Sequence, residues 1–158
     1  MRVIRTAYLQ VPKKNGKTIM GGSPVIYAMY GEGVKGADCY ISANTFEQCQ
    51  NAAGPIALTI ENSPDLRPDT RIYKGKEDTI KSIKYTFVED DIKYANVIKV
   101  LTKDNAGNEG KNPYINYFDE VHAQMDREQY DNLRSAQIAQ DEPLNIITST
   151  AGKQSGSL

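Results

Sequence analysis

The segment VPKKNGKT, from Val11 to Thr18, restricts the possible folds most strongly because it follows a strand-favouring run from Val3 to Val11. Where a strand leads into a helix, backbone N–H groups can wrap phosphate oxygens. The spacing puts Gly16, Lys17 and Thr18 where a phosphate-binding loop needs them, with the lysine on the β- and γ-phosphates and the hydroxyl on Mg²⁺. A valine replaces the first glycine of the usual pattern, so a solvated basic turn is the alternative.

Strand and helix signals alternate along the rest of the chain. Runs of apolar and β-favouring residues predict strands at Ala37–Ala43, Tyr114–Phe118 and Leu144–Thr150, a pair of adjacent strands between Arg71 and Thr102, and a helix from Asp126 to about Gln140. A Gly- and Asn-rich loop is expected at 104–113. This order predicts one α/β domain over residues 1–158, with a mainly parallel central sheet, flanking helices and some antiparallel strands.

Two further helices carry residues that oppose helix formation. The helix after Thr18 must pass through GGSP at 21–24, and glycine and proline cost about 1 and 3 kcal/mol relative to alanine, so we expect it to be kinked or unusually short. Thr45 and Gln48 have the spacing of a capping box and predict the start of another helix. Pro55 should bend or shorten that helix.

Polar residues stand directly after two predicted strands. Asp119 follows Phe118, where a carboxylate can hold Mg²⁺, and Glu120 can act as the general base that polarises an attacking water. Small hydroxyl residues, Ser149 and Thr150 within TSTAG, follow the last apolar run. Open α/β sheets bind ligands at the carboxyl ends of their strands, so these groups should meet the phosphate loop at one edge. The alternative is that both strand ends are ordinary solvated turns.

Composition excludes several classes of protein. The formal net charge is −1, so any contact with nucleic acid must be local or made by parts outside this chain. The two cysteines, Cys39 and Cys49, fit no metal-ligand spacing and are too few for a disulfide framework, which favours reduced core residues in a cytosolic protein. No apolar run approaches the roughly 20 residues of a membrane span.

The segments PKKNGKT, FDEVHA, DREQYDNL and ITSTAG, together with ANTFEQC and SPDL, resemble the ATPase domain of the large subunit of tailed-phage terminases. The resemblance covers nearly the whole chain and implies a P-loop NTPase of the additional-strand, catalytic-glutamate type, with ATP and Mg²⁺ as cofactors. It assigns catalysis to Lys17 and Glu120, nucleotide binding to Lys13, Lys14, Asn15, Gly16, Lys17 and Thr18, the metal to Thr18 and Asp119, and coupling of hydrolysis to movement to Ser149 and Thr150.

The same resemblance implies a motor that moves double-stranded DNA into the procapsid, in the cytoplasm of the bacterial host. Its expected partners are copies of itself in a ring, the portal protein and the terminase small subunit, with no membrane. Lys13 takes a position where family members carry Arg or Lys, and a lysine supplies only a point charge to the γ-phosphate. A structural role is favoured for His122, and the sequence does not choose between Arg127 and Arg134 as an arginine that reaches a neighbouring site.

Two segments usual in terminase large subunits are not found within these 158 residues: the adenine-contacting segment upstream and the nuclease domain downstream. The chain is therefore expected to be an ATPase core with weak activity in isolation, or else an inactive truncated prophage remnant. A helicase-like or other remodelling P-loop ATPase is a further alternative, because such motors share the three motifs.

Overall fold

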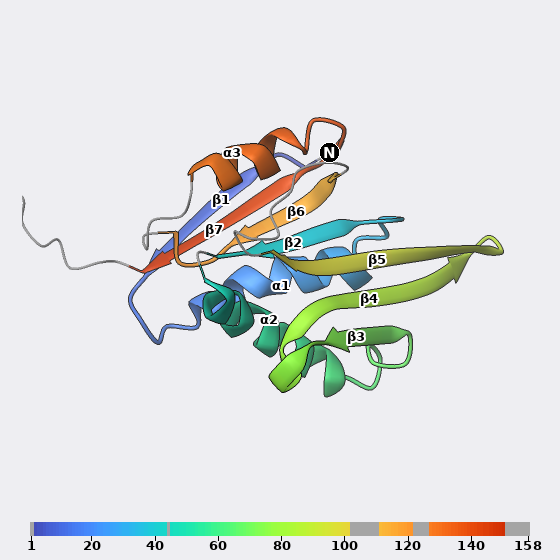
Figure 1. The fold of residues 1–158 in the computed structure, drawn as a ribbon. Helices are drawn as coiled ribbons and strands as arrows, with labels where there is room; N and C mark the ends of the chain where they lie inside the picture. Colours follow the sequence, from blue (N-terminus) through green and yellow to red (C-terminus); the bar gives the residue numbers. More distant parts are fainter. Residues whose placement is uncertain (1, 44, 102–110, 122–126, 151–158) are drawn as a thin grey trace, which may run out of the picture.

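Seven strands form one sheet in the computed structural model, which describes residues 2–43, 45–101, 111–121 and 127–150 (Figure 1). In chain order the strands are β1 (Thr6–Val11), β2 (Asp38–Ser42), β3 (Thr70–Lys74), β4 (Ile80–Glu89), β5 (Ile92–Leu101), β6 (Pro113–Phe118) and β7 (Leu144–Thr150). Their order across the sheet is β1-β7-β6-β2-β5-β4-β3. The predicted loop at 104–113 falls mostly outside the described residues.

The first five strands in that order run parallel, and β4 and β3 add antiparallel pairs at one side. The predicted parallel sheet with some antiparallel strands is thus confirmed. The segment 71–102 holds three strands rather than the predicted pair. The additional strand, β3, has only five residues with three charged or exposed positions, so it carries little of the apolar signal of a buried strand.

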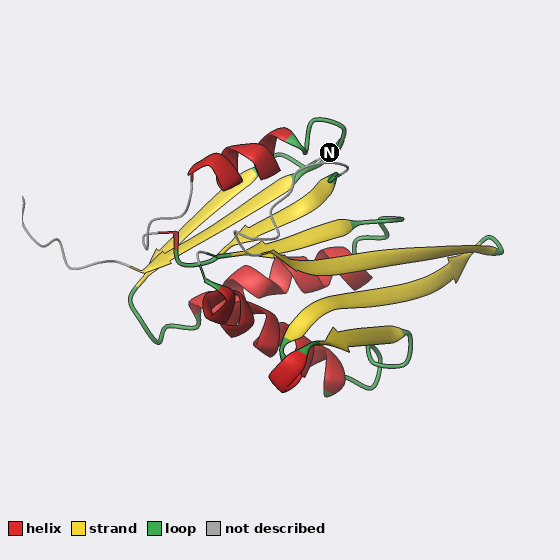
Figure 2. Cartoon of the chain, in the orientation of Figure 1, coloured by secondary structure: helices red, strands yellow, loops and turns green. Residues whose placement is uncertain are grey.

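The helices are α1 (Lys17–Tyr30), α2 (Phe46–Glu61) and α3 (Arg127–Ser135), and a short 3₁₀ helix, η1, spans Lys76–Asp78. Figure 2 shows α1 and α2 on one face of the sheet and α3 on the other. Alternate residues of β6 separate the two layers, since Tyr117 packs in the core under α1 and α2 while Phe118 packs with Leu133 of α3. Within the described part of the chain, none of the helices combines the length and apolar character needed to cross a membrane.

Helix α1 runs for 14 residues, so the expectation of an unusually short helix is wrong. Its two glycines let it lie close to its neighbours. A Cβ atom on Gly21 would lie 2.6 Å from the ring of Tyr117, and one on Gly22 would lie 3.0 Å from Cγ1 of Ile56. Burial against β6 and α2 therefore offsets the low helix propensity of the GGSP segment.

Helix α2 begins with the predicted capping box. The Thr45 hydroxyl accepts from the Gln48 N–H at 3.2 Å, and the Gln48 side chain accepts from the Thr45 N–H at 3.3 Å. The helix continues through Pro55 to Glu61, so it is not shortened as expected. Gly54 precedes the proline, and a residue without Cβ avoids the clash that disfavours helical backbone at that position.

Helix α3 is shorter than predicted, since it ends at Ser135 rather than near Gln140. Beyond it the chain makes tighter turns in which N–H groups reach back three residues, as from Ile138 to the Ser135 carbonyl. Both cysteines are free and buried, which confirms the expectation of core residues. Burial raises the pKa of the Cys39 thiol to about 12 and that of Cys49 to about 11.

The glycines of α1 give a stability prediction. Gly21→Ala should lower the free energy of unfolding by about 1–2 kcal/mol, because overpacking against the fully buried Tyr117 outweighs the gain in helix propensity. Gly22→Ala is the matched control and should be closer to neutral, since its neighbour is a flexible end of Ile56. Urea denaturation measures both, and a Gly21→Ala variant as stable as the native chain would contradict the packing described.

Candidate functional site

The loop between β1 and α1 leaves the first turn of the helix open to a ligand. Gly16 is the N-cap residue, with φ of 70°, and no side chain caps the helix. Lys14 also has left-handed backbone, with φ of 67°. The N–H groups of this turn are thus available to oxygen atoms of an anion, as the sequence pattern predicts.

Lys17, the first residue of α1, sends a buried ammonium group to the strand ends. The residue is 8% exposed. Its Nζ atom lies 3.5 Å from Oδ1 of Asp119, forms an ion pair with Glu120, and donates to the hydroxyl of Thr150 at 3.2 Å. Groups that are more than a hundred residues apart in the chain are thereby brought together.

The two acids at the end of β6 differ in burial and backbone. Asp119 is 3% exposed, and its N–H donates to the Ser42 carbonyl at the end of β2. Glu120 is partly exposed and has φ of 55°, a left-handed conformation that costs a residue with a side chain about 1–3 kcal/mol. This turn lets both carboxylates face Lys17 and points to a role for Glu120 beyond packing.

The hydroxyl residues of β7 divide between the two sides of the strand. Thr150 donates to both carboxylate oxygens of Glu120, at 3.0 and 3.2 Å. Thr148 donates to Oδ1 of Asp119 at 2.5 Å and is fully buried. Ser149 is also buried, but its hydroxyl contacts only the Thr150 carbonyl among the described residues.

The sequence interpretation thus missed Thr148 as a site residue and paired Thr150 with Ser149 instead. Period-two alternation along a strand could have found it, since residues 148 and 150 share one side of β7. Oδ1 of Asp119 also accepts from the Glu120 N–H at 3.0 Å. The described donors to Asp119 therefore gather on one oxygen and hold the plane of the carboxylate.

A cavity of about 420 Å³ opens at this edge of the sheet. Its lining comes from the phosphate loop, α1, α2 and the two strand ends: Pro12, Lys13, Lys14, Gly16, Lys17, Thr18, Ile19, Asn51, Pro55, Glu120 and Thr150. The exposed side chain of Asn15 bonds instead to the Pro12 carbonyl at 3.3 Å, within the loop. His122, Ala151, Gly152 and the side chain of Arg127 lie outside the described residues.

These groups fit a nucleotide phosphate chain with a divalent cation. Lysine ammonium groups and helix N–H groups bind phosphate, and the Thr18 hydroxyl with the Asp119 carboxylate offers the oxygen ligands that Mg²⁺ prefers. No cluster of three or more His, Cys, Asp or Glu side chains suited to a metal occurs among the described residues. A cation here would thus complete its shell with phosphate oxygens and water, which is usual for Mg²⁺.

Comparisons with known proteins agree with this geometry. The sequence model of the family described as "Terminase large subunit, ATPase domain" matches residues 1–158. No curated protein matches the sequence significantly. Among solved structures, the chain is similar to the large terminase ATPase domain of Thermus phage P74-26, with a TM-score of 0.71, 12% identity, and coverage of 96% of this chain and 62% of that one.

Two further large terminases have the same fold. One, from a thermophilic bacteriophage, gives a TM-score of 0.69 at 16% identity, covering 93% of this chain and 34% of that one. That of bacteriophage HK97 gives 0.68 at 22% identity, covering 92% and 29%. The chain therefore spans less than two thirds of the length of these structures.

Thr148 gives a prediction about the metal. Thr148→Val keeps the shape of the side chain but removes the donor to Asp119, so the Mg²⁺ concentration for half-maximal ATP binding should rise about tenfold, the size expected for a bond to a charged group. Thr148→Ser keeps the hydroxyl and should restore the native value. Calorimetric titrations at several Mg²⁺ concentrations measure this. An equal Mg²⁺ requirement in all three proteins would mean that Thr148 only fills space.

Proposed function

This chain belongs to the family of terminase large-subunit ATPase domains, and on that premise we propose that residues 1–158 form one domain that binds and hydrolyses ATP with Mg²⁺. The observation that carries the proposal is the convergence of Lys17, Asp119, Glu120 and Thr150 beside an uncapped helix N-terminus. The large terminase of the thermophilic bacteriophage has been solved with ADP and with ATP-gamma-S, which supports a nucleotide as the ligand.

The binding roles follow from the positions of the side chains. Lys17 and the N–H groups after Gly16 would bind the β- and γ-phosphates, and Lys13 and Lys14 would add positive charge from the loop. Thr18 and Asp119 would hold Mg²⁺, whose bound charge would stabilise the negative charge that develops on the transferred phosphoryl group. The buried Cys49 thiol has its pKa raised to about 11 by burial, so it adds no charge near Asp119.

Glu120 is proposed as the general base. A base must accept a proton from the attacking water, yet Glu120 is paired here with Lys17 and Thr150. Phosphate oxygens would compete for the Lys17 ammonium and release the carboxylate while Thr150 continues to orient it. ATP binding would in this way prepare the base, and Thr150 would connect the base to the end of β7.

For the whole protein we propose translocation of double-stranded DNA into a viral procapsid. A homo-oligomeric ring, the portal protein and the terminase small subunit would be its partners, in the cytoplasm of the bacterial host. Family membership supports this over a helicase-like or other remodelling ATPase. The presence of both acids and Lys17 also speaks against an inactive remnant.

A pair of substitutions separates binding from chemistry. Glu120→Gln keeps the size of the side chain but removes the base, so ATP affinity should be retained while hydrolysis falls by about 10²–10⁴-fold. Lys17→Ala is the binding control and should lose most of its affinity for Mg·ATP. Calorimetry measures binding, and release of phosphate measures hydrolysis, in this chain and in the longer protein with DNA present, since a ring neighbour can complete such a site.

The outcomes distinguish the alternatives. Hydrolysis at the native rate with Gln at position 120 would remove Glu120 as the base. Equal ATP affinity with and without the Lys17 ammonium would reduce the GKT segment to a turn. A native protein that binds ATP but never hydrolyses it, even at full length and with DNA, would favour the inactive remnant.

A further inference from the structure

The outer part of the sheet has one face that no described helix covers. Helices α1 and α2 lie on the opposite side of β5, β4 and β3, and α3 lies over β6 and its neighbours (Figure 1). Alternation along the strands brings Arg71, Tyr73, Lys84 and Lys93 to the uncovered face. We name these four residues the basic sheet face.

The cations of this face oppose each other without compensation. Arg71 on β3 is the direct cross-strand partner of Lys84 on β4, and like charges in that arrangement are destabilising. No acid forms an ion pair with Arg71, Lys84 or Lys93 within the described ranges. The arrangement is thus an electrostatic cost in a chain whose net charge is −1.

A shallow cavity of about 720 Å³ lies over this face. Its lining includes the basic sheet face and one acid, Asp69, along with Pro68, Thr86, Phe87 and Val88. Tyr73 is 45% exposed, so its hydroxyl is free to reach a ligand as a donor.

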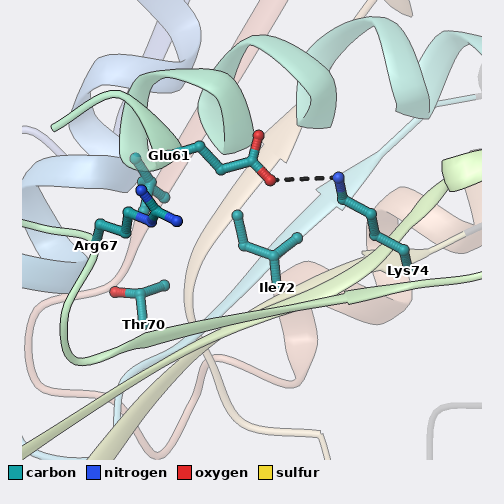
Figure 3. Close-up of a pocket in the computed structure, with 6 residues that line it drawn as sticks. Glu61, Arg67, Thr70, Ile72 and Lys74 are labelled. Carbon is teal, nitrogen blue, oxygen red and sulfur yellow. Dashed lines mark ion pairs between the residues drawn. The ribbon is translucent and has the colours of Figure 1, made fainter.

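The other face of the same strand gives the contrast. There Lys74 turns toward α2 and pairs with Glu61 at 3.3 Å, beside Arg67 and Ile72, as Figure 3 shows. The cation on that side is neutralised within the chain. Cations on the uncovered side are left for an external anion.

We propose that the basic sheet face binds the phosphate backbone of DNA, an inference that rests on the proposed translocase function. Lys93 is the neighbour of Val88, four positions along β4 from Lys84, so the cations extend over about 13 Å of the hairpin. A DNA strand carries about four phosphates over that length. The contact reads charge and spacing rather than bases, as a protein that moves along any sequence requires.

Arginine and lysine contacts of this kind release counterions, so affinity depends steeply on salt. The test compares two triple variants of the full chain. One neutralises Arg71→Gln, Lys84→Gln and Lys93→Gln. The matched control neutralises Lys74→Gln, Lys76→Gln and Lys81→Gln, which removes the same charge from exposed residues of the same region without touching the cavity lining.

Binding is measured by fluorescence anisotropy with a short fluorescein-labelled DNA duplex over a range of salt concentrations. The first variant should lose at least about tenfold in affinity, and the slope of log affinity against log salt should become about three units shallower. The control should bind like the native chain. Native thermal melting and native affinity for Mg·ATP in both variants would show that neither the fold nor the nucleotide site has changed.

Three results would overturn the proposal: native DNA affinity in the first variant, an equal loss in both variants, or no binding of duplex by the native chain at low salt. In the last case, saturable binding of poly-glutamate would assign the face to an acidic protein instead. Each result leaves the proposed ATPase site to its own test, because ATP binding is measured separately in the same proteins.

Discussion

The buried ammonium group of Lys17 is the interaction on which the rest of the site depends. A charge so far from solvent must be compensated, and Asp119, Glu120 and Thr150 supply that compensation. The same contacts make the site responsive, because phosphate oxygens can replace the carboxylates around Lys17. A fixed charge thereby serves the empty site as an ion-pair partner and the occupied site as a ligand.

Parallel strand order makes this convergence possible. Strands β1, β7 and β6 are neighbours and end at the same edge, although β1 precedes the other two by about a hundred residues. Close packing of α1 against β6, through Gly21 and Tyr117, fixes where the helix begins and hence where Lys17 points. The Tyr117 hydroxyl also donates to the Thr18 carbonyl at 3.5 Å, and burial raises its pKa, so it remains a neutral donor.

Sequence patterns predicted the features that local chemistry determines. The loop before Lys17, the acids after β6 and the capping box at Thr45 each have a local cause, and all were placed correctly. The length of α1 was not predictable, because its glycines are favourable only against Tyr117 and Ile56 across the fold. Thr148 was missed because its role depends on a partner in β6, and the cross-strand pair of Arg71 and Lys84 depends on a register that neither strand encodes alone.

The most direct test of the central claim is the measured position of the γ-phosphate group in a crystal structure of this chain with ATP-gamma-S and Mg²⁺. We expect it within hydrogen-bonding distance of the Lys17 ammonium, with the Lys17–Glu120 pair opened and Thr150 still bonded to Glu120. A nucleotide bound away from this edge of the sheet, or bound here with the Lys17–Glu120 pair intact, would contradict the proposed site and the proposed release of its base.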